Sequence, residues 1–357
     1  MNPLFTGEMY KRALEVIHIL KKHEYEALLV GGCVRDALLG LDTPKDLDIA
    51  TSATPDQVTT LFKRTLQVGK AFGVIIVLWA DYQFEVSTFR NDGPYTDGRH
   101  PDYVRFGTYH EDVLRRDFTI NGLFYNPSAA HIIDLVGGQD DLNDKLIRAI
   151  GEPSQRFQED HLRMLRAVRF ACQLDFSIES QTYETLCESA SHIAFVSEER
   201  IRNELKRILT SQIPAKGFKM LLDTGLFSFI LPELQNIEIQ KMLLRLNTSL
   251  PSFEIAFTLL CYDLRENLEQ VESLGKRLRL TNEEIKEVLN LLREAPRFKT
   301  LKNMSKSELR KFLALPYFPA IKTVYKSYIE SVGDSDTPLL FAEQVFAEYQ
   351  EIPLKPD

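Results

Sequence analysis

The stretch from Leu28 to Thr51 constrains the fold of this chain more than any other part of the sequence. It reads LLVGGCVRDALLGLDTPKDLDIAT: an apolar strand, a turn at two glycines, a short helix, and a return through Asp46 and Asp48. Adjacent glycines let a backbone pass close to a bulky anion, and the amides at a helix start can hold that anion. The order strand, turn, helix, strand therefore predicts a unit that cradles a phosphate.

Two groups of candidate residues follow from this stretch. Gly31 and Gly32 would form the phosphate-binding turn, and Arg35 is the first cation able to reach phosphate oxygens with its planar fork. Asp46 and Asp48 are two residues apart, so in a strand both would face the same side as hard oxygen ligands for a metal ion. An ordinary turn followed by a solvent-facing acidic pair is the alternative interpretation, and it fits each half of the pattern taken alone.

Length and composition set wider limits. The chain has 357 residues, enough for two or more structural units, and 44% of them are hydrophobic. The longest wholly apolar run, Val74 to Ala80, is too short to span a bilayer, so we expect no membrane segment. The formal net charge of −8 argues only mildly against a nucleic-acid partner, because a local basic face can bind phosphates on an acidic protein.

The cysteines and the N-terminus indicate a cytoplasmic protein. The N-terminal residues MNPLFTGEMYKR lack the apolar core of a signal peptide. The cysteines show no CxxC spacing, so neither a disulfide framework nor a zinc site is indicated. They are Cys33, Cys172, Cys187 and Cys261.

The first hundred residues predict further elements of a mixed domain. Residues 9–22 carry apolar side chains at helical spacing, and a short helix begins at Pro55 and runs through Phe62. Residues 74–79 and 83–89 read as a hairpin. Glu85 lies in the middle of its second strand, where an acidic residue is costly unless it is paired or binds metal. If that strand neighbours Asp46 and Asp48, three carboxylates converge, enough to hold two divalent ions. An exposed Glu on an edge strand is the alternative.

Two segments after the hairpin add candidates. Residues 91–104, NDGPYTDGRHPDYV, predict a mobile loop long enough to act as a lid or lever. The run RRDFTIN at 115–121 places two arginines beside Asp117, ahead of an apolar strand at 123–125. The arginines could neutralise phosphates, and Asp117 could accept a hydrogen bond from a ribose hydroxyl. A solvated turn explains the same residues.

Residues 156–170, RFQEDHLRMLRAVRF, predict one helix with an apolar face and a charged face. Helix salt bridges would explain the charges. A sharper interpretation uses Asp160 as an acceptor and Arg163 as a donor. Cytosine and adenine both present an amino donor beside a ring-nitrogen acceptor, whereas uracil and guanine present the reverse, so such a pair would admit C and A and refuse U and G.

The rest of the chain predicts helices without strand-like alternation. Ser197 precedes one of them, and capping boxes at Thr281–Glu284 and Ser305–Glu308 begin two more. Residues 297–311 carry six basic residues against one Glu, and KRLR at 276–279 is a smaller cluster. Both are candidate contacts for the backbone of a structured RNA, although a solvated helix face explains them nearly as well. A loop at 333–338 precedes a last helix at about 339–350.

These segments together resemble a known family. GGCVRD with DLD, FEVSTFR, RRDFTIN, EDHLR at 159–163 and SEERIRNEL resemble, in order, the signatures of the class II tRNA nucleotidyltransferases and bacterial poly(A) polymerases, over roughly residues 25–235. The resemblance implies an α+β protein of seahorse-like shape. Its expected parts are a nucleotidyltransferase head at 1–150, a helical neck at 151–215, and a helical body and shortened tail at 216–357.

The resemblance also implies an activity and its residues. The chain would add CCA, or its terminal A, to the 3′ end of tRNA from CTP and ATP, with two Mg²⁺ ions. Asp46, Asp48 and Glu85 would be the catalytic metal ligands. The nucleotide would be bound by Gly31, Gly32, Arg35, Arg116, Asp117, Asn121, Asp160, Arg163 and Arg166.

The sequence departs from the family pattern in places, and rivals stay open. His161 stands where Pro or Ala is expected, and the chain stops early for a CCA-adding enzyme, which would reduce the tail that grips tRNA. NGLFY at 121–125 is closer to A-adding and poly(A)-adding relatives. A poly(A) polymerase, a small-molecule nucleotidyltransferase and a non-catalytic RNA-binding protein are the alternatives, and the oligomeric state is not indicated.

Overall fold

The computed structural model describes residues 4–41, 46–247 and 250–350, with side chains through residue 347. The chain forms two compact units. The first comprises Met1–Ala167 with Phe176–Ser189, and the second comprises Val168–Asp175 with Ala190–Asp357. We call them the N-terminal and C-terminal units. None of the helices in the described ranges combines the length and apolar character needed to cross a bilayer.

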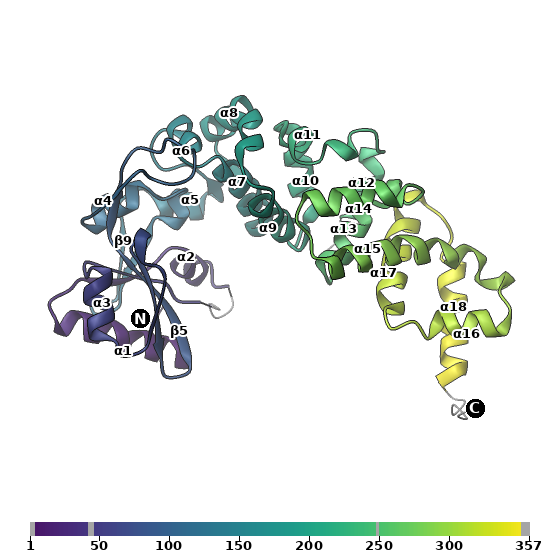
Figure 1. Ribbon diagram of the computed structural model, residues 1–357, viewed down its shortest axis with the longest axis horizontal. Helices are drawn as coiled ribbons and strands as arrows, with labels where there is room; N and C mark the ends of the chain where they lie inside the picture. Colours follow the sequence, from purple (N-terminus) through teal and green to yellow (C-terminus); the bar gives the residue numbers. More distant parts are fainter. Residues whose placement is uncertain (1–3, 42–45, 248–249, 351–357) are drawn as a thin grey trace. The chain divides into compact units, whose positions relative to one another are not determined.

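The N-terminal unit, which holds β5 and β9 in Figure 1, is built around a seven-stranded sheet. Its strand order is β3-β4-β5-β2-β1-β8-β9. Neighbouring strands are antiparallel except β2 and β5, which are parallel, so the sheet is mixed. The α+β fold class predicted from the sequence is confirmed. The strands are β1 (Ala27–Val30), β2 (Ile49–Thr51), β3 (Thr65–Gly69), β4 (Val74–Trp79), β5 (Tyr82–Thr88), β8 (Leu123–Asn126) and β9 (His131–Asp134).

Shorter elements complete the N-terminal unit. Two small sheets pair β6 with β7 and β10 with β11. Their strands are β6 (Arg90–Asp92), β7 (Val104–Phe106), β10 (Leu146–Ile147) and β11 (Ser177–Ile178). The helices are α1 (Glu8–Lys22), α2 (Gly32–Leu38), α3 (Pro55–Leu61), η1 (Lys70–Phe72), α4 (Tyr109–Leu114), η2 (Thr119–Asn121), α5 (Gly138–Asn143), α6 (Pro153–Glu159) and α8 (Ser180–Ser189), while α7 (Leu162–Leu174) carries residues of both units.

One face of the main sheet packs against α1 and α3, and we call it the inner face (Figure 1). Ile75, Val77 and Trp79 of β4 point to this face: the first two are fully buried, and the Trp79 indole donates a hydrogen bond to Glu15 of α1 at 2.6 Å. Helix α3 begins where Thr54 forms a capping box with Gln57 and Pro55 takes the first helical position. Burying each large aliphatic side chain on this face contributes about 1.5–3 kcal/mol.

The opposite, outer face is covered only in part. A buried cluster joins Val30 of β1 and Phe124 of β8 to Val113 of α4, so α4 covers the outer face over β1, β8 and β9. Residues alternate between faces along a strand, so Glu85 of β5 and Ile76 of β4 point outward, away from α1 and α3. Both side chains are more exposed than their buried neighbours on the inner face.

The C-terminal unit is helical in its described part. Phe298 lies flat on Tyr325, with ring centroids 4.7 Å apart, and Arg245 is buried with a double hydrogen bond to Asp263. Its elements are η3 (Ala190–Phe195), α9 (Glu198–Leu209), α10 (Pro214–Asp223), α11 (Leu226–Ile230), η4 (Pro232–Leu234), α12 (Ile239–Arg245), α13 (Phe253–Leu260), η5 (Tyr262–Leu264), α14 (Leu268–Arg277), α15 (Asn282–Glu294), η6 (Ala295–Asn303), α16 (Lys306–Leu313), α17 (Phe318–Val332) and α18 (Thr337–Gln350).

Several local predictions are confirmed. The helix at 9–22 and the 74–79 hairpin strand are present, and both predicted capping boxes form, at Thr281 and Ser305. Three predictions need correction. The predicted helix 156–170 is broken into α6 and α7, two-residue β11 lies in the part predicted to be wholly helical, and short β6 and β7 pair at the ends of the predicted loop 91–104.

Candidate functional site

The predicted carboxylates lie where β1, β2 and β5 run side by side. Asp46 and Asp48 precede β2 rather than lying in it, which corrects the expectation that they share a strand. Even so, the backbone carbonyl of Asp48 accepts a hydrogen bond from Val30 at 3.1 Å, so Asp48 continues the pairing with β1. In the parallel register Ile49 lies opposite Val86, which places Asp48 beside Glu85. The condition that Glu85 lies on a strand next to the acidic pair is therefore met.

The charges of these carboxylates are unbalanced. Burial, followed by repulsion from Glu85 and Asp46, raises the pKa of Asp48 to about 6, and Arg116 only partly opposes this. Among the described residues no side chain donates a hydrogen bond to the Asp48 carboxylate. A half-buried carboxylate of this kind is stabilised when a cation neutralises it.

The donor set fits magnesium bound together with a substrate. In the described residues no group of three or more His, Cys, Asp or Glu side chains is arranged to hold a metal ion by itself. Mg²⁺ is usually held by one or two carboxylates and completes its shell with water and substrate phosphates. Asp48 and Glu85, with Asp46 two residues away, would supply oxygen ligands of that kind to such an ion.

The glycine turn joins β1 to α2 directly beside Asp48. Gly31 has φ of 76°, a left-handed conformation that other residues rarely adopt, and its amide donates to the carbonyl of Leu123. A Cβ built on Gly31 would lie 3.4 Å from the Arg116 guanidinium, so that cation faces the turn. Phosphate binding by Gly31, Gly32 and Arg35 stays a prediction, and the geometry puts Arg116 at the same place.

A buried polar network connects α2 to α7. Arg35 donates to the side-chain oxygen of Asn121 at 2.6 Å, and the Asn121 amide donates to Asp117 at 3.0 Å. Asp117 also accepts two hydrogen bonds from Arg166, at 2.9 and 2.5 Å, and one from the amide of Phe118. The predicted nucleotide-binding residues of this group are thus bonded to one another across three elements.

Asp117 is held as a carboxylate by this network. Burial alone would raise its pKa, but the charge of Arg166 and the hydrogen bonds from Asn121 and Arg166 outweigh it and lower the pKa well below its usual range. Both carboxylate oxygens are engaged, so Asp117 is a fixed acceptor within the framework.

Asp112 is a site residue that the sequence reasoning missed. It is 1% exposed, and its two oxygens bond Arg115 and Arg116 separately, at 2.6 and 2.8 Å. Burial raises the pKa of Asp112, but the charges of Arg116 and Arg115 outweigh burial, so the pKa lies below its usual value. The signal was present, because Asp112 stands three and four residues before the arginines, the spacing of helical ion pairs.

The break between α6 and α7 falls at Asp160 and His161. Asp160 ends α6 with extended backbone angles of −147° and 103°, and its carboxylate accepts from the amide of Leu162, which begins α7. Arg163 is 8% exposed and donates to Glu159 at 2.6 Å and to the carbonyl of Arg115 at 2.8 Å. Asp160 and Arg163 therefore come from different segments rather than from one helix face.

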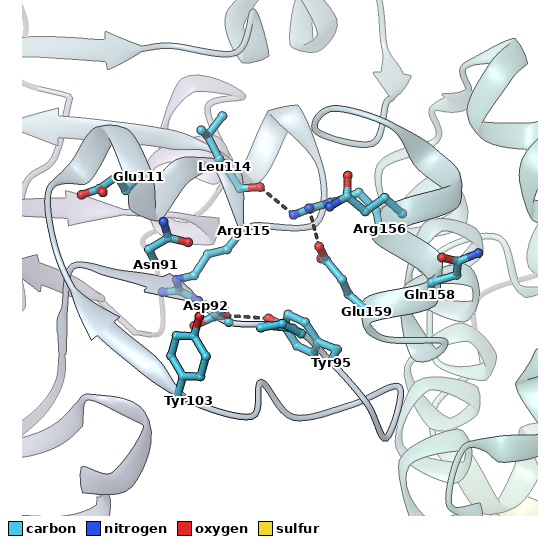
Figure 2. A pocket seen from close by; sticks show the side chains of 13 residues that line it. Asn91, Asp92, Tyr95, Tyr103, Glu111, Leu114, Arg115, Arg156, Gln158 and Glu159 are labelled. Carbon is cyan, nitrogen blue, oxygen red and sulfur yellow. Dashed lines mark hydrogen bonds and ion pairs between the residues drawn. The ribbon is translucent and has the colours of Figure 1, made fainter.

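A pocket of about 570 Å³ lies beside this break (Figure 2). Arg156 spans it, donating to the carbonyl of Leu114 at 2.6 Å and to Glu159 at 2.5 Å, while Tyr95 donates to Asp92 at 2.6 Å. The pocket is lined by Asn91, Asp92, Gly93, Pro94, Tyr95, Tyr103, Glu111, Leu114, Arg115, Gln155, Arg156, Gln158 and Glu159. It brings the predicted loop 91–104 against α6 and contains none of the three carboxylates.

Comparison with known families identifies two regions of the chain. Residues 27–148 match the model of the poly A polymerase head domain. Residues 175–238 match the model described as the probable RNA and SrmB-binding site of polymerase A. Together the two models cover more than half of the sequence, and the first contains the three carboxylates and the glycine turn.

Named relatives agree with the family models. The chain is 40% identical over 232 residues to a CCA-adding enzyme of Geobacillus sp. (strain WCH70), which is 65% of this chain and 57% of that protein. It is 40% identical over 282 residues to a CCA-adding enzyme of Lactiplantibacillus plantarum, which is 78% of this chain and 69% of that protein. The matched stretch thus spans less than two thirds of the Geobacillus relative's length.

A solved structure supports the same assignment. The chain is similar to the Bacillus stearothermophilus CCA-adding enzyme in complex with CTP, with a TM-score of 0.82 and 30% identity over 98% of this chain and 84% of that one. Both the sequence relatives and this structure extend across the N-terminal and C-terminal units. On these grounds the chain belongs to the class II CCA-adding enzyme family.

Proposed function

We propose that this protein is a template-independent nucleotidyltransferase that adds CCA, or its terminal A, to the 3′ end of tRNA from CTP and ATP. The observation that carries the proposal is the placement of Asp48 beside Glu85 at the Gly31 turn, in a chain 40% identical to CCA-adding enzymes. We infer a cytoplasmic location, in keeping with a tRNA acceptor and with four free cysteines.

In this proposal the carboxylates bind Mg²⁺ and the surrounding residues position the nucleotide. Asp46, Asp48 and Glu85 would hold two ions, which supply charge stabilisation for in-line phosphoryl transfer when bound. The RNA 3′-hydroxyl attacks the α-phosphorus and pyrophosphate leaves. Arg116, which faces the Gly31 turn, would offset charge on the departing phosphates, so the protein's contribution is positioning and electrostatics.

Base choice would depend on the junction of α6 and α7. Asp160 would accept from the amino group of C or A, and Arg163 would donate to the ring nitrogen. Glu159 fixes the Arg163 guanidinium through a 2.6 Å hydrogen bond, and the backbone carbonyls of Arg156 and Arg115 fix it further. A guanidinium held in this way keeps its planar fork in one orientation, which is what discrimination between base edges requires.

The helical C-terminal unit is proposed to bind the acceptor RNA. The basic stretch 297–311 lies on η6 and α16, where Lys299 bonds to Tyr328 and Asp334, and Arg297 packs over the Phe312 ring. These contacts hold the stretch in place within the unit. The division into head, neck and body at residues 150 and 215 is kept as part of the proposal.

A poly(A) polymerase is the second candidate, favoured by the match of residues 27–148 to a poly A polymerase head domain. It would use the same carboxylates but would extend a generic oligonucleotide with many A residues. The two candidates differ in acceptor and in product length rather than in chemistry.

The test gives the purified protein tRNA transcripts ending before CCA, after C and after CC, with CTP, ATP or both. A CCA-adding enzyme completes all three transcripts and stops. An A-adding enzyme extends only the CC transcript, by one residue, and a poly(A) polymerase adds many A residues to a tRNA and to an unrelated oligonucleotide alike. If the protein incorporates no nucleotide but binds tRNA, the non-catalytic alternative holds and the proposal is wrong.

A further inference from the structure

Strand β4 has an unusual sequence for its position. It reads VIIVLW, apolar on both faces. Ile75 and Val77 are fully buried on the inner face, whereas Val74 and Ile76 are only half-buried on the outer face. Antiparallel strands with one face toward water normally alternate apolar and polar residues, and continuous apolar runs are typical of strands covered on both faces. The sequence of β4 therefore suits an outer face that is covered in use.

The apolar residues on this outer face continue directly from the carboxylates. Glu85 of β5 pairs with Ile76 of β4, and Ile76 pairs with Leu66 of edge strand β3. With Asp48 beside Glu85, one row of outward side chains runs from Asp48, just before β2, across β5, β4 and β3 at steps of about 4.8 Å. We call Leu66, Val74 and Ile76 the apolar shelf; Leu66 is 42% exposed although it is apolar.

The chemistry of the reaction indicates from which side of Asp48 the acceptor RNA approaches. In-line transfer places the attacking hydroxyl and the leaving pyrophosphate on opposite sides of the reacting phosphorus. The Gly31 turn, with Arg116 facing it, lies on the β1 side of Asp48. Strands β5 and β4 lie on the other side of Asp48 in the strand order. The end of the acceptor therefore approaches from the side of the apolar shelf.

Positive charge borders the shelf at its edge. Lys63 and Arg64 are exposed just before β3, and neither forms an ion pair with a described residue. The carbonyl of Arg64 accepts from the amide of Leu78, which places the Arg64 backbone opposite Leu78 near the end of β4. At that end of the sheet, Lys63 and Arg64 line a pocket together with Trp79 and with residues of α1. A cation pair next to an apolar surface matches a nucleic-acid strand, with its charged backbone and flat bases.

We propose that the apolar shelf seats the 3′-terminal nucleoside of the acceptor RNA, with its base against Ile76 and Leu66 and its 3′-hydroxyl toward Glu85. This inference rests on the proposed nucleotidyltransferase function. It adds to that function a subsite for the acceptor, formed by residues outside those proposed to bind the incoming nucleotide or the metal ions.

The test is a double-mutant cycle that combines removal of the acceptor's terminal base with substitutions in the apolar shelf. Acceptors are tRNA transcripts ending in CC, with either an ordinary cytidine or an abasic riboside at the last position. The variants are Ile76→Thr, which keeps a β-branched side chain, and Leu66→Gln, at a position exposed enough to leave folding intact. Val68→Thr is the matched control, an apolar residue that is 84% exposed on the same edge strand but outside the shelf. Initial rates with ATP give kcat/KM for each acceptor.

The wild-type protein should use the cytidine-ended acceptor about tenfold better than the abasic one, because base contacts of this kind contribute on that scale. In Ile76→Thr and Leu66→Gln the ratio should fall toward one, with loss on the cytidine acceptor only, while Val68→Thr keeps the wild-type ratio. If both shelf variants keep the full ratio, the shelf does not seat the terminal base and the inference is wrong, although the proposed function stands. If the wild-type protein extends neither acceptor, the proposed function fails and the inference falls with it.

Discussion

Two groups of charged side chains in the N-terminal unit differ in how their charges are balanced. Asp48 and Glu85 lie together without a described donor, and burial with repulsion raises the pKa of Asp48 to about 6. Asp117 instead accepts from Asn121 and Arg166, and its pKa is lowered. The negative charge of the first group would be neutralised by a bound cation, whereas the charge of Asp117 is already balanced by Arg166. We therefore expect the first to govern catalysis and the second to govern stability.

The largest expected effect is on catalysis, from Asp48→Asn. Removing one carboxylate should lower nucleotide incorporation by about a thousandfold, because metal-assisted charge stabilisation supplies several kcal/mol of the barrier reduction. The unfolding free energy at pH 7.5 should not fall, since the substitution relieves repulsion from Glu85. Asp81→Asn, in the exposed turn between β4 and β5, is the control and should keep full activity. Incorporation by Asp48→Asn at near wild-type rate would remove the basis of the comparison.

The second prediction concerns stability, from Asp117→Asn. Breaking a buried pair with Arg166 should lower the unfolding free energy by about 3 kcal/mol at pH 7. The folded pKa of Asp117 is below its ordinary value of 3.8, so its stabilisation is present above that pH and is lost as the pH falls below it. Urea unfolding at pH 7 and pH 3 should show the gap between wild type and variant shrinking at pH 3. A constant gap, or an equal loss in exposed Asp144→Asn, would contradict the assignment.

The third prediction concerns base choice by Arg163, which is expected to contact the ligand and is also held by Glu159. Arg163→Ala should lower the preference for CTP and ATP over UTP by about tenfold or more, since a site that hydrogen-bonds one base edge rejects the wrong edge strongly. Glu159→Gln, which keeps the shape but weakens the support of Arg163, should give a smaller change in the same direction. Single-nucleotide incorporation with each triphosphate measures this. Unchanged rejection of UTP in Arg163→Ala would mean that Arg163 serves the framework alone.

The smallest expected effect is on thermal stability in the presence of Mg²⁺. An ion at ten times its Kd should stabilise the wild-type protein by about 1.4 kcal/mol, seen as a rise of a few degrees in Tm. The rise should be larger at pH 7.5 than at pH 5, because Asp48, with a pKa of about 6, must be ionised to bind. An equal rise in Asp48→Asn would place the ion elsewhere.

Much of the site was predictable because several of its residues can be recognised from the local sequence around them. Gly31 needed a conformation open to glycine, and Glu85 in a half-buried strand needed a partner, so both stood out in the sequence. The pairing of β2 with β5 was the condition that the sequence could not supply, because strand neighbours depend on contacts between distant segments.

Other features were hidden for physical reasons. The break at Asp160 was missed because its flanks keep helical spacing. The break forms where Asp160 takes extended backbone angles and its carboxylate accepts a hydrogen bond from the amide of Leu162. The bonds that join Asn121 to Arg35 and Asp117 depend on tertiary packing of α2, η2 and α7. Burial of this kind converts residues predicted to touch a ligand into residues that also support one another.

The single parallel pairing in the main sheet has a consequence for biosynthesis. Asp48 and Glu85 are separated in the chain by the whole of α3, β3 and β4, and β2 meets β5 only after those elements have been made. Pairings between segments so far apart form late, because a long loop must close first. A nascent chain on the ribosome therefore cannot bring Asp46, Asp48 and Glu85 together until β5 has emerged. A truncated product that ends before Tyr82 would keep the two aspartates but lack Glu85.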